Sequence, residues 1–256
     1  MAYWLDQFHI FLLILLRVSA LLIVAPIFGH RLLLGRAKIG LAAMISFVLL
    51  PLLAARGPVV PPSLLPYALM MVREVIMGLA LGFAVLLLFV GVQFAGQLAG
   101  LEMGFGIINV IDPQSQEEVS LIGQFLNTLA ILTVLVTDGH HLILRGLCAS
   151  FDIVPLGAVH LRPPMMAELL ALSGQVFVIA VKISAPVLVT LLLITVALGV
   201  LARTVPQMNV FMVGFPVQVA AGLVVLLASM PLFQVLLRQL WTDLERNFMT
   251  LVALFA

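Results

Sequence analysis

Charged residues are scarce in this 256-residue chain: 9% are Asp, Glu, Lys or Arg, against about 25% in soluble domains. Hydrophobic residues make up 64% of the chain, well above the roughly 45–50% of soluble domains. The formal net charge is only +1, so the chain has no electrostatic reason to bind nucleic acid. This composition excludes a soluble globular protein and predicts an all-α, polytopic membrane protein.

Cysteine and the common catalytic motifs are also missing. Cys148 is the only cysteine, which excludes an intrachain disulfide and a Cys-rich metal site. The chain has no GxSxG, HExxH, P-loop or GxGxxG sequence. His140 and His141 follow Asp138 and Gly139, but neighbouring histidines are expected to point apart on a helix, and no Glu or Cys stands at ligand spacing. We therefore predict no metal, no cofactor and no enzymatic activity.

What the chain does have is long apolar runs. A membrane-spanning helix needs about 20 apolar residues. Six runs qualify as candidates: residues 8–28, 39–55, 64–103, 119–136, 165–202 and 210–237. The start of the chain has no basic signal-peptide region, so the first run is expected to be retained. The runs at 64–103 and 165–202 have about double the needed length. The run at 64–103 is either two crossings or one long, bent helix. The tail at 239–256 alternates charged and apolar residues, which is typical of a helix at the membrane–water interface.

The segment at residues 104–118 is unlike any of these runs. Arg31, Arg36 and Lys38 predict a cytoplasmic loop after the first helix, with the N-terminus outside. Alternation then places residues 104–118 in the cytoplasm, yet they include no Lys or Arg. A non-helical segment at the depth of the membrane is tolerated only where protein surrounds it or where it lines a water-filled lumen. The rule on basic residues in loops does not apply to such a segment. Its glycines and aliphatic side chains favour a flexible apolar loop that closes an aqueous path; the alternative is a loop docked against the bundle.

Glycines recur at a spacing of four, which places them on one helix face. They are Gly78 and Gly82 in one group, and Gly96, Gly100 and Gly104 in another. Such a face lets a second backbone approach closely. The sequence leaves open whether that backbone belongs to the chain itself or to another subunit.

Three charged residues, Arg17, Glu74 and Lys182, lie deep within apolar runs. A charge at the bilayer centre costs about 2.5–3.5 kcal/mol on insertion scales, so each is expected to have a partner or face a cavity. Pairing of Glu74 with Arg17 or Lys182 is favoured over a proton or ion relay, which normally uses more titratable groups. Arg73 adjoins Glu74 but is expected to point to another part of the helix surface.

Several motifs resemble the FliR family of flagellar type III export gates, whose virulence-secretion relatives are called SctT. One is LEMG at residues 101–104, followed by Asp-Pro at 112–113. The most specific is LARTVPQMNVFMVGFP at residues 201–216. Within it stand Arg203, Pro206, Gln207 and Asn209. Arg-Glu-Val at 73–75 with Gly78, and the stretch from Asn127 through Asp-Gly-His at 138–140, also fit. The resemblance spans nearly the whole chain, and the Pro-Gln-Met-Asn form points to the flagellar branch.

The resemblance implies a single-copy, non-enzymatic subunit of the flagellar export gate in the bacterial inner membrane and the flagellar basal body. With FliP and FliQ, joined by FlhB, it would form the channel for unfolded flagellar subunits, in contact with membrane lipid. Residues 1–160 would pack like FliP and residues 161–256 like a FliQ hairpin, with long, bent helices in a helical assembly.

The resemblance further implies that the segment between the glycine-rich helix and Asp-Pro plugs the closed pore. The plug residues in this chain would be Phe105, Ile107, Ile108, Val110 and Ile111. Some relatives place phenylalanines there, whereas Phe105 is the only aromatic residue in this plug. The alternative function is a small ion-coupled secondary transporter that uses Glu74 and Lys182.

Overall fold

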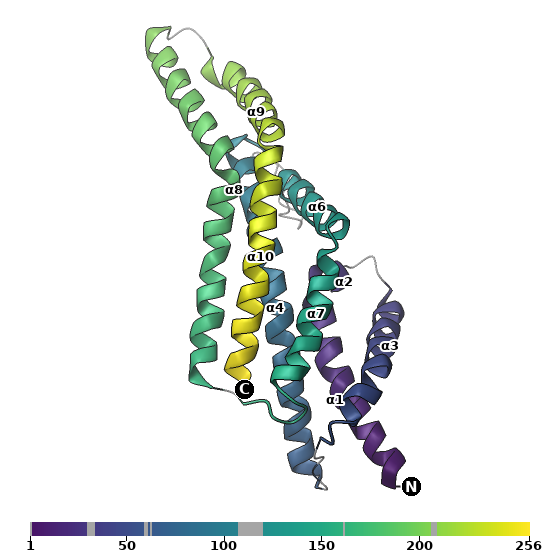
Figure 1. The fold of residues 1–256 in the computed structure, drawn as a ribbon. Coiled ribbons are helices and arrows are strands. Elements are labelled where there is room, and N and C mark those ends of the chain that lie inside the picture. The colour runs from purple at the N-terminus through teal and green to yellow at the C-terminus, as the bar shows by residue number, and fades with distance from the viewer. Residues whose placement is uncertain are drawn as a thin grey trace. The chain divides into compact units, whose positions relative to one another are not determined.

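The computed structural model describes residues 2–29, 34–58, 61, 63–106, 120–160, 162–205 and 209–256. Regular structure in these ranges is helical throughout, without a strand (Figure 1). The helices are α1 (Ala2–Val24), α2 (Pro26–Gly29), α3 (Gly35–Ala54), α4 (Leu64–Glu102), α6 (Leu121–Val136), α7 (Gly139–Ile153), α8 (Pro163–Thr204), α9 (Val210–Ala228) and α10 (Met230–Phe255).

The predicted all-α membrane fold is confirmed. Within the described ranges, four helices are long and apolar enough to cross a membrane: α1, α3, α4 and α8. The number rises to six if each of the bent pairs α6–α7 and α9–α10 counts as one span. The chain is therefore a polytopic helical protein with at least four candidate membrane-spanning helices among the described residues.

Both double-length apolar runs form single continuous helices. Helix α4 has 39 residues and α8 has 42. At a rise of about 1.5 Å per residue these helices extend roughly 58 and 63 Å, about twice the thickness of a hydrocarbon core. Pro186 lies inside α8 without ending it. Of the two readings left open for residues 64–103, the long helix is therefore correct.

Proline and serine mark helix boundaries that hydropathy alone did not reveal. Pro26 begins the short helix α2 and so divides the first predicted run, since proline is favoured at the first position of a helix. The run at 210–237 divides at Ser229, the C-cap of α9, and Pro231 follows in the first turn of α10. The tail predicted to be interfacial instead continues α10, with an apolar face that is buried within the chain. Helix α7 was not predicted as a separate element.

The helices form two compact units, each assembled from segments that are distant in sequence. The first unit comprises Met1–Leu87, Val134–Ser173 and Trp241–Ala256. The second comprises Leu88–Thr133 and Gly174–Leu240. The predicted division into residues 1–160 and 161–256 concerns likeness to other subunits, and it stays a prediction.

Each unit has its own core. In the first unit α1 lies beside α3 (Figure 1), and the core is made by α1, the first half of α4, α7 and the end of α10. Its most deeply buried apolar side chains include Leu13, Leu21, Met77, Ile143, Phe151 and Phe255. In the second unit α9 folds back along α8 (Figure 1), and the Gln218 amide of α9 donates a hydrogen bond of 3.2 Å to Thr195 Oγ1 of α8.

Candidate functional sites

A buried ion pair joins α1 to α4 in the first unit. Arg17 Nε donates to Glu74 Oε2 at 2.6 Å, and neither side chain has any exposed surface. Pairing of Glu74 with Arg17 was one of the two pairings that the sequence favoured. Burial of two charges is tolerated because each is compensated by the other and by further hydrogen bonds.

Helix α7 and the loop after it supply those further hydrogen bonds. Arg17 Nη1 donates to the carbonyl oxygens of Ser150 and Val154, both at 3.1 Å. Glu74 Oε1 accepts from the backbone N–H of Gly157 at 3.0 Å. The guanidinium also lies 4.3 Å from the ring centroid of Phe151, a separation at which a cation is attracted to the ring face. The pair therefore fixes three segments of the chain together.

This network has the properties of a structural site. Both oxygens of Glu74 are engaged, one by Arg17 and one by Gly157. A relay carboxylate needs a route for protons and a neighbouring titratable group, and the contacts of Glu74 are instead a permanent cation and a backbone amide. Sequence reasoning missed Ser150, Val154 and Gly157, because backbone donors and acceptors leave no signal in a sequence.

The other charged residues near this network are exposed. Arg73 is exposed while Glu74 is buried, as predicted for sequence neighbours on a helix. Arg73 and Arg56 line an open pocket of about 520 Å³ at the end of the first unit. Arg56 Nη2 pairs with Asp152 Oδ1 at 2.5 Å, and the two side chains are 40% and 60% exposed. Lys182 is exposed on α8, so the partner predicted for it stays a prediction.

The first pair of glycines packs α4 against α1. A Cβ atom on Gly78 would collide with the carbonyl oxygen of Arg17, and one on Gly82 would lie 2.9 Å from the carbonyl oxygen of Leu21. Backbone atoms cannot yield to such contacts as a flexible side chain can. For these two glycines, the close partner is the chain's own first helix. The same contact holds α4 at the distance that lets Glu74 reach Arg17.

The second group packs α4 against α6 in the second unit. A Cβ atom on Gly96 would lie 2.5 Å from Gly123 Cα, and one on Gly100 would lie 2.5 Å from Ser120 Oγ. Ser120 Oγ donates to the carbonyl oxygen of Gly96 at 3.4 Å. Gly123 was not singled out from the sequence, because a lone glycine shows no spacing pattern. These contacts bring the last turns of α4 next to the start of α6.

Gly104 has a different role from the one predicted. It lies beyond the end of α4 at φ = +89°, where L side chains are strained. Its N–H donates to Leu101 O and the Phe105 N–H donates to Gly100 O, both at 3.0 Å, which is the hydrogen-bond pattern of a Schellman motif. The glycine that was expected on the packing face is therefore the residue that ends the helix. Phe105 follows directly and is partly buried.

Much of the predicted plug lies outside the described residues. Ile107, Ile108, Val110 and Ile111 belong to this group, so their role stays a prediction.

In the 201–216 motif, Arg203 is exposed in the last turn of α8, where a positive charge interacts favourably with the helix dipole. Asn209 is the N-cap of α9 and accepts from the Met212 N–H at 3.4 Å. Pro206 and Gln207 lie outside the described residues.

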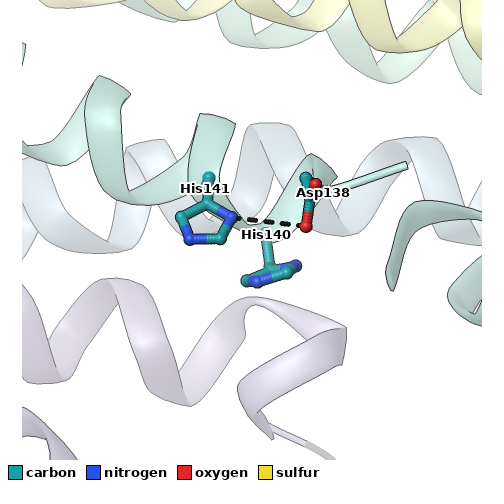
Figure 2. A group of neighbouring side chains, drawn as sticks. All are labelled: Asp138, His140 and His141. Carbon is teal, nitrogen blue, oxygen red and sulfur yellow. Dashed lines mark ion pairs between the residues drawn. The ribbon is translucent and has the colours of Figure 1, made fainter. Parts of the chain in front are cut away.

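Three residues of types that can bind metal ions, Asp138, His140 and His141, lie together at the start of α7 (Figure 2). The rings of His140 and His141 have centroids 4.2 Å apart, so the prediction that they point apart is wrong. Side chains in the first turn of a helix lean back toward its N-terminus, and here both rings lean toward Asp138. His141 Nδ1 is 3.7 Å from Asp138 Oδ1.

Comparisons with known proteins agree with the motifs. The family model described as bacterial export proteins, family 1, matches residues 8–244. The chain is 36% identical to the flagellar biosynthetic protein FliR of Bacillus subtilis, over 96% of this chain and 97% of that protein. It is 31% identical to the FliR of Escherichia coli, over 94% and 92%, and 30% identical to that of Aquifex aeolicus, over 95% and 94%.

Proposed function

The chain belongs to the bacterial export proteins, family 1, and from that membership we propose that it is a non-enzymatic subunit of the flagellar type III protein export gate. With FliP and FliQ, joined by FlhB, it forms the channel through which unfolded flagellar subunits leave the cytoplasm. The complex lies in the inner membrane, in the basal body of the flagellum. The family membership is the observation that carries this proposal, and the exposed apolar helices described next support it.

The distribution of apolar surface supports a role within an assembly. In the most apolar 18-residue window of α8, only 11% of the residues are buried by the chain itself, and the value for α3 is 17%. Exposed large side chains along the α8–α9 hairpin include Phe177, Leu192, Leu193, Met212 and Phe215. Lipid or other subunits must cover such a surface. Lipid alone would need about 30 Å of apolar helix, and α8 is roughly twice that length.

Secondary transport is less well supported. A transporter would use Glu74 and Lys182 for ion coupling, but Glu74 is occupied by Arg17 and Gly157 in a site without exposed surface. Transporter sites normally hold ionisable groups that face a cavity and can exchange ions or protons. The buried pair instead joins α1, α4 and the end of α7 within the first unit.

Co-purification tests the assembly. The chain is expressed from its native locus with a small affinity tag, extracted in mild detergent, and its companions are identified by mass spectrometry. We expect FliP and FliQ in stable association, with FlhB in smaller amounts. Purification of the chain by itself from flagellated cells, under conditions in which other flagellar complexes survive, would contradict the proposal.

The plug assigned to residues 107–111 is tested in the same complex. Replacement of Ile107, Ile108, Val110 and Ile111 by glycine removes apolar contacts that exclude water. We expect normal assembly and a membrane that leaks ions and small solutes. The matched control replaces the polar residues Gln114, Ser115 and Gln116 by glycine, which leaves the aliphatic side chains in place. Equal leakage from the plug variant and the unaltered complex would show that the segment merely docks against other helices.

A further inference from the structure

We propose that Asp138, His140 and His141 form a binding site for a divalent transition-metal ion, with Zn²⁺, Ni²⁺ and Cu²⁺ as the fitting class. The three residues offer one carboxylate oxygen and two imidazole nitrogens, all within 4.8 Å of one another (Figure 2). Imidazole nitrogen with a carboxylate oxygen is a donor set that suits these ions. This site is independent of the export proposal.

The separations between the ligand atoms are close to those that a metal needs. Ligands about 2.1 Å from a tetrahedral zinc ion lie roughly 3.4 Å from one another. The separation of Asp138 Oδ1 from His141 Nδ1 is 3.7 Å. The widest separation has to shorten by at most about 1.4 Å. The side chains of Asp138 and His141 are 75% and 57% exposed, which leaves room for both to rotate toward a common ion.

The Asp138 carboxylate is directed at the imidazoles rather than at the helix. Asp at an N-cap usually accepts a hydrogen bond from a backbone N–H in the first turn. Here the Asp138 side chain makes no such capping bond to the described part of α7. Its backbone has φ = +55°, a left-handed conformation that Asp tolerates better than most residues. In this geometry Oδ1 faces His141 (Figure 2).

His140 supplies the second, independent observation. Its Nδ1 atom is buried and has no hydrogen-bond partner among the described residues. A buried polar atom without a partner is costly, and coordination or a hydrogen bond that accompanies coordination would satisfy the ring.

The surroundings hold the cluster in place and leave it accessible. The indole of Trp241 packs on Gly139, where an added Cβ would lie 2.6 Å from Trp241 Nε1. This contact fixes the backbone between Asp138 and His140. The side chain of Asp138 is 75% exposed, so an ion can reach the site from water. Three protein ligands leave further coordination positions for water. A bound ion ties the turn residue Asp138 to the first turn of α7.

Zinc binding by the purified protein tests the proposal. The full chain, in its native complex, carries an affinity tag without histidine and is washed with chelator. Zinc is then titrated in competition with a chromophoric chelator, and Co²⁺ is used as a spectroscopic probe. We expect one zinc ion per chain and visible Co²⁺ absorption bands from mixed nitrogen and oxygen ligands. We also expect zinc to raise the thermal unfolding temperature.

Single-ligand variants assign the site. Asp138→Asn, His140→Gln and His141→Gln should each weaken zinc binding at least about tenfold and abolish the stabilisation by zinc. His160→Gln, an exposed histidine outside the cluster, should leave both unchanged. Circular dichroism and gel filtration establish that each variant is folded. Absence of zinc binding by the unaltered protein would overturn the proposal, as would variants that bind zinc as tightly as the unaltered protein does.

Discussion

Helices α4 and α8 are alike in sequence and opposite in burial. Both are apolar helices of about forty residues, and both are interrupted by very few charges. Yet 61% of the most apolar window of α4 is buried by the chain, against 11% for α8. Hydropathy therefore indicates which segments form long helices, but it does not indicate which of those helices are buried in the core of the chain.

Small residues and the buried charge explain the difference. The α4 glycines at positions 78, 82, 91, 96 and 100 all have neighbours at or below contact distance in the space where a Cβ would stand. Gly174 and Gly199 of α8 have no described atom within 4 Å of that position. Glu74 of α4 is buried against Arg17, whereas Lys182 of α8 is exposed. Helix α4 is thus built to pack within the chain, and α8 presents its surface outward.

The largest expected effect is at the buried charge. Glu74→Gln keeps the shape of the side chain but leaves Arg17 buried without a counter-charge, which costs about 3–5 kcal/mol. Asp152→Asn is the matched control, because it makes the same change in an exposed ion pair and should cost about 0–1 kcal/mol. Lys182→Gln on α8 should change the stability of the chain little. Unfolding titrations with SDS in mixed micelles measure all three, and equal losses at Glu74 and Asp152 would contradict the account.

Glycine substitutions should act with opposite signs on the two helices. Gly96→Ala places a methyl group 2.5 Å from the backbone of Gly123, and overpacking of this kind costs about 1–3 kcal/mol. Gly199→Ala meets no described atom within 4 Å and should stabilise the helix by up to about 1 kcal/mol. The same titration of the isolated chain measures both. A neutral Gly96→Ala would mean that α4 and α6 do not approach as closely as described.

A smaller effect is expected where α9 begins after α8. Asn209→Ala removes the side-chain acceptor for the Met212 N–H, and loss of an N-cap costs about 0.5–2 kcal/mol. The 3.4 Å separation favours the lower end of that range. Asn209→Ser, which keeps a capping oxygen, should recover most of the loss. If serine and alanine are equally destabilising, Asn209 stabilises the chain in some way other than capping.

Parts of this structure follow directly from sequence and parts do not. The lengths of α3 and α6 were predicted to within a few residues, because hydropathy and helix length depend on the same membrane thickness. A charged partner for Glu74 was expected from the cost of a buried charge, and Arg17 was one of the two candidates that the sequence offered. The residue that packs against Gly96 is Gly123, and it could not be predicted because it belongs to no periodic pattern of glycines. The 4.2 Å separation of the His140 and His141 rings depends on their side-chain rotamers, which residue identity alone does not specify.

The measurement that tests the central claim most directly compares Gly96→Leu with Gly199→Leu, both in the isolated chain and in the complex with other gate subunits. Gly96→Leu should destabilise the isolated chain, since its clash is with the backbone of α6. Gly199→Leu should leave the isolated chain intact and reduce the yield of complex on native gels, because α8 is proposed to pack against other subunits. Full assembly of the complex with Gly199→Leu would contradict that claim and assign this part of the α8 surface to lipid.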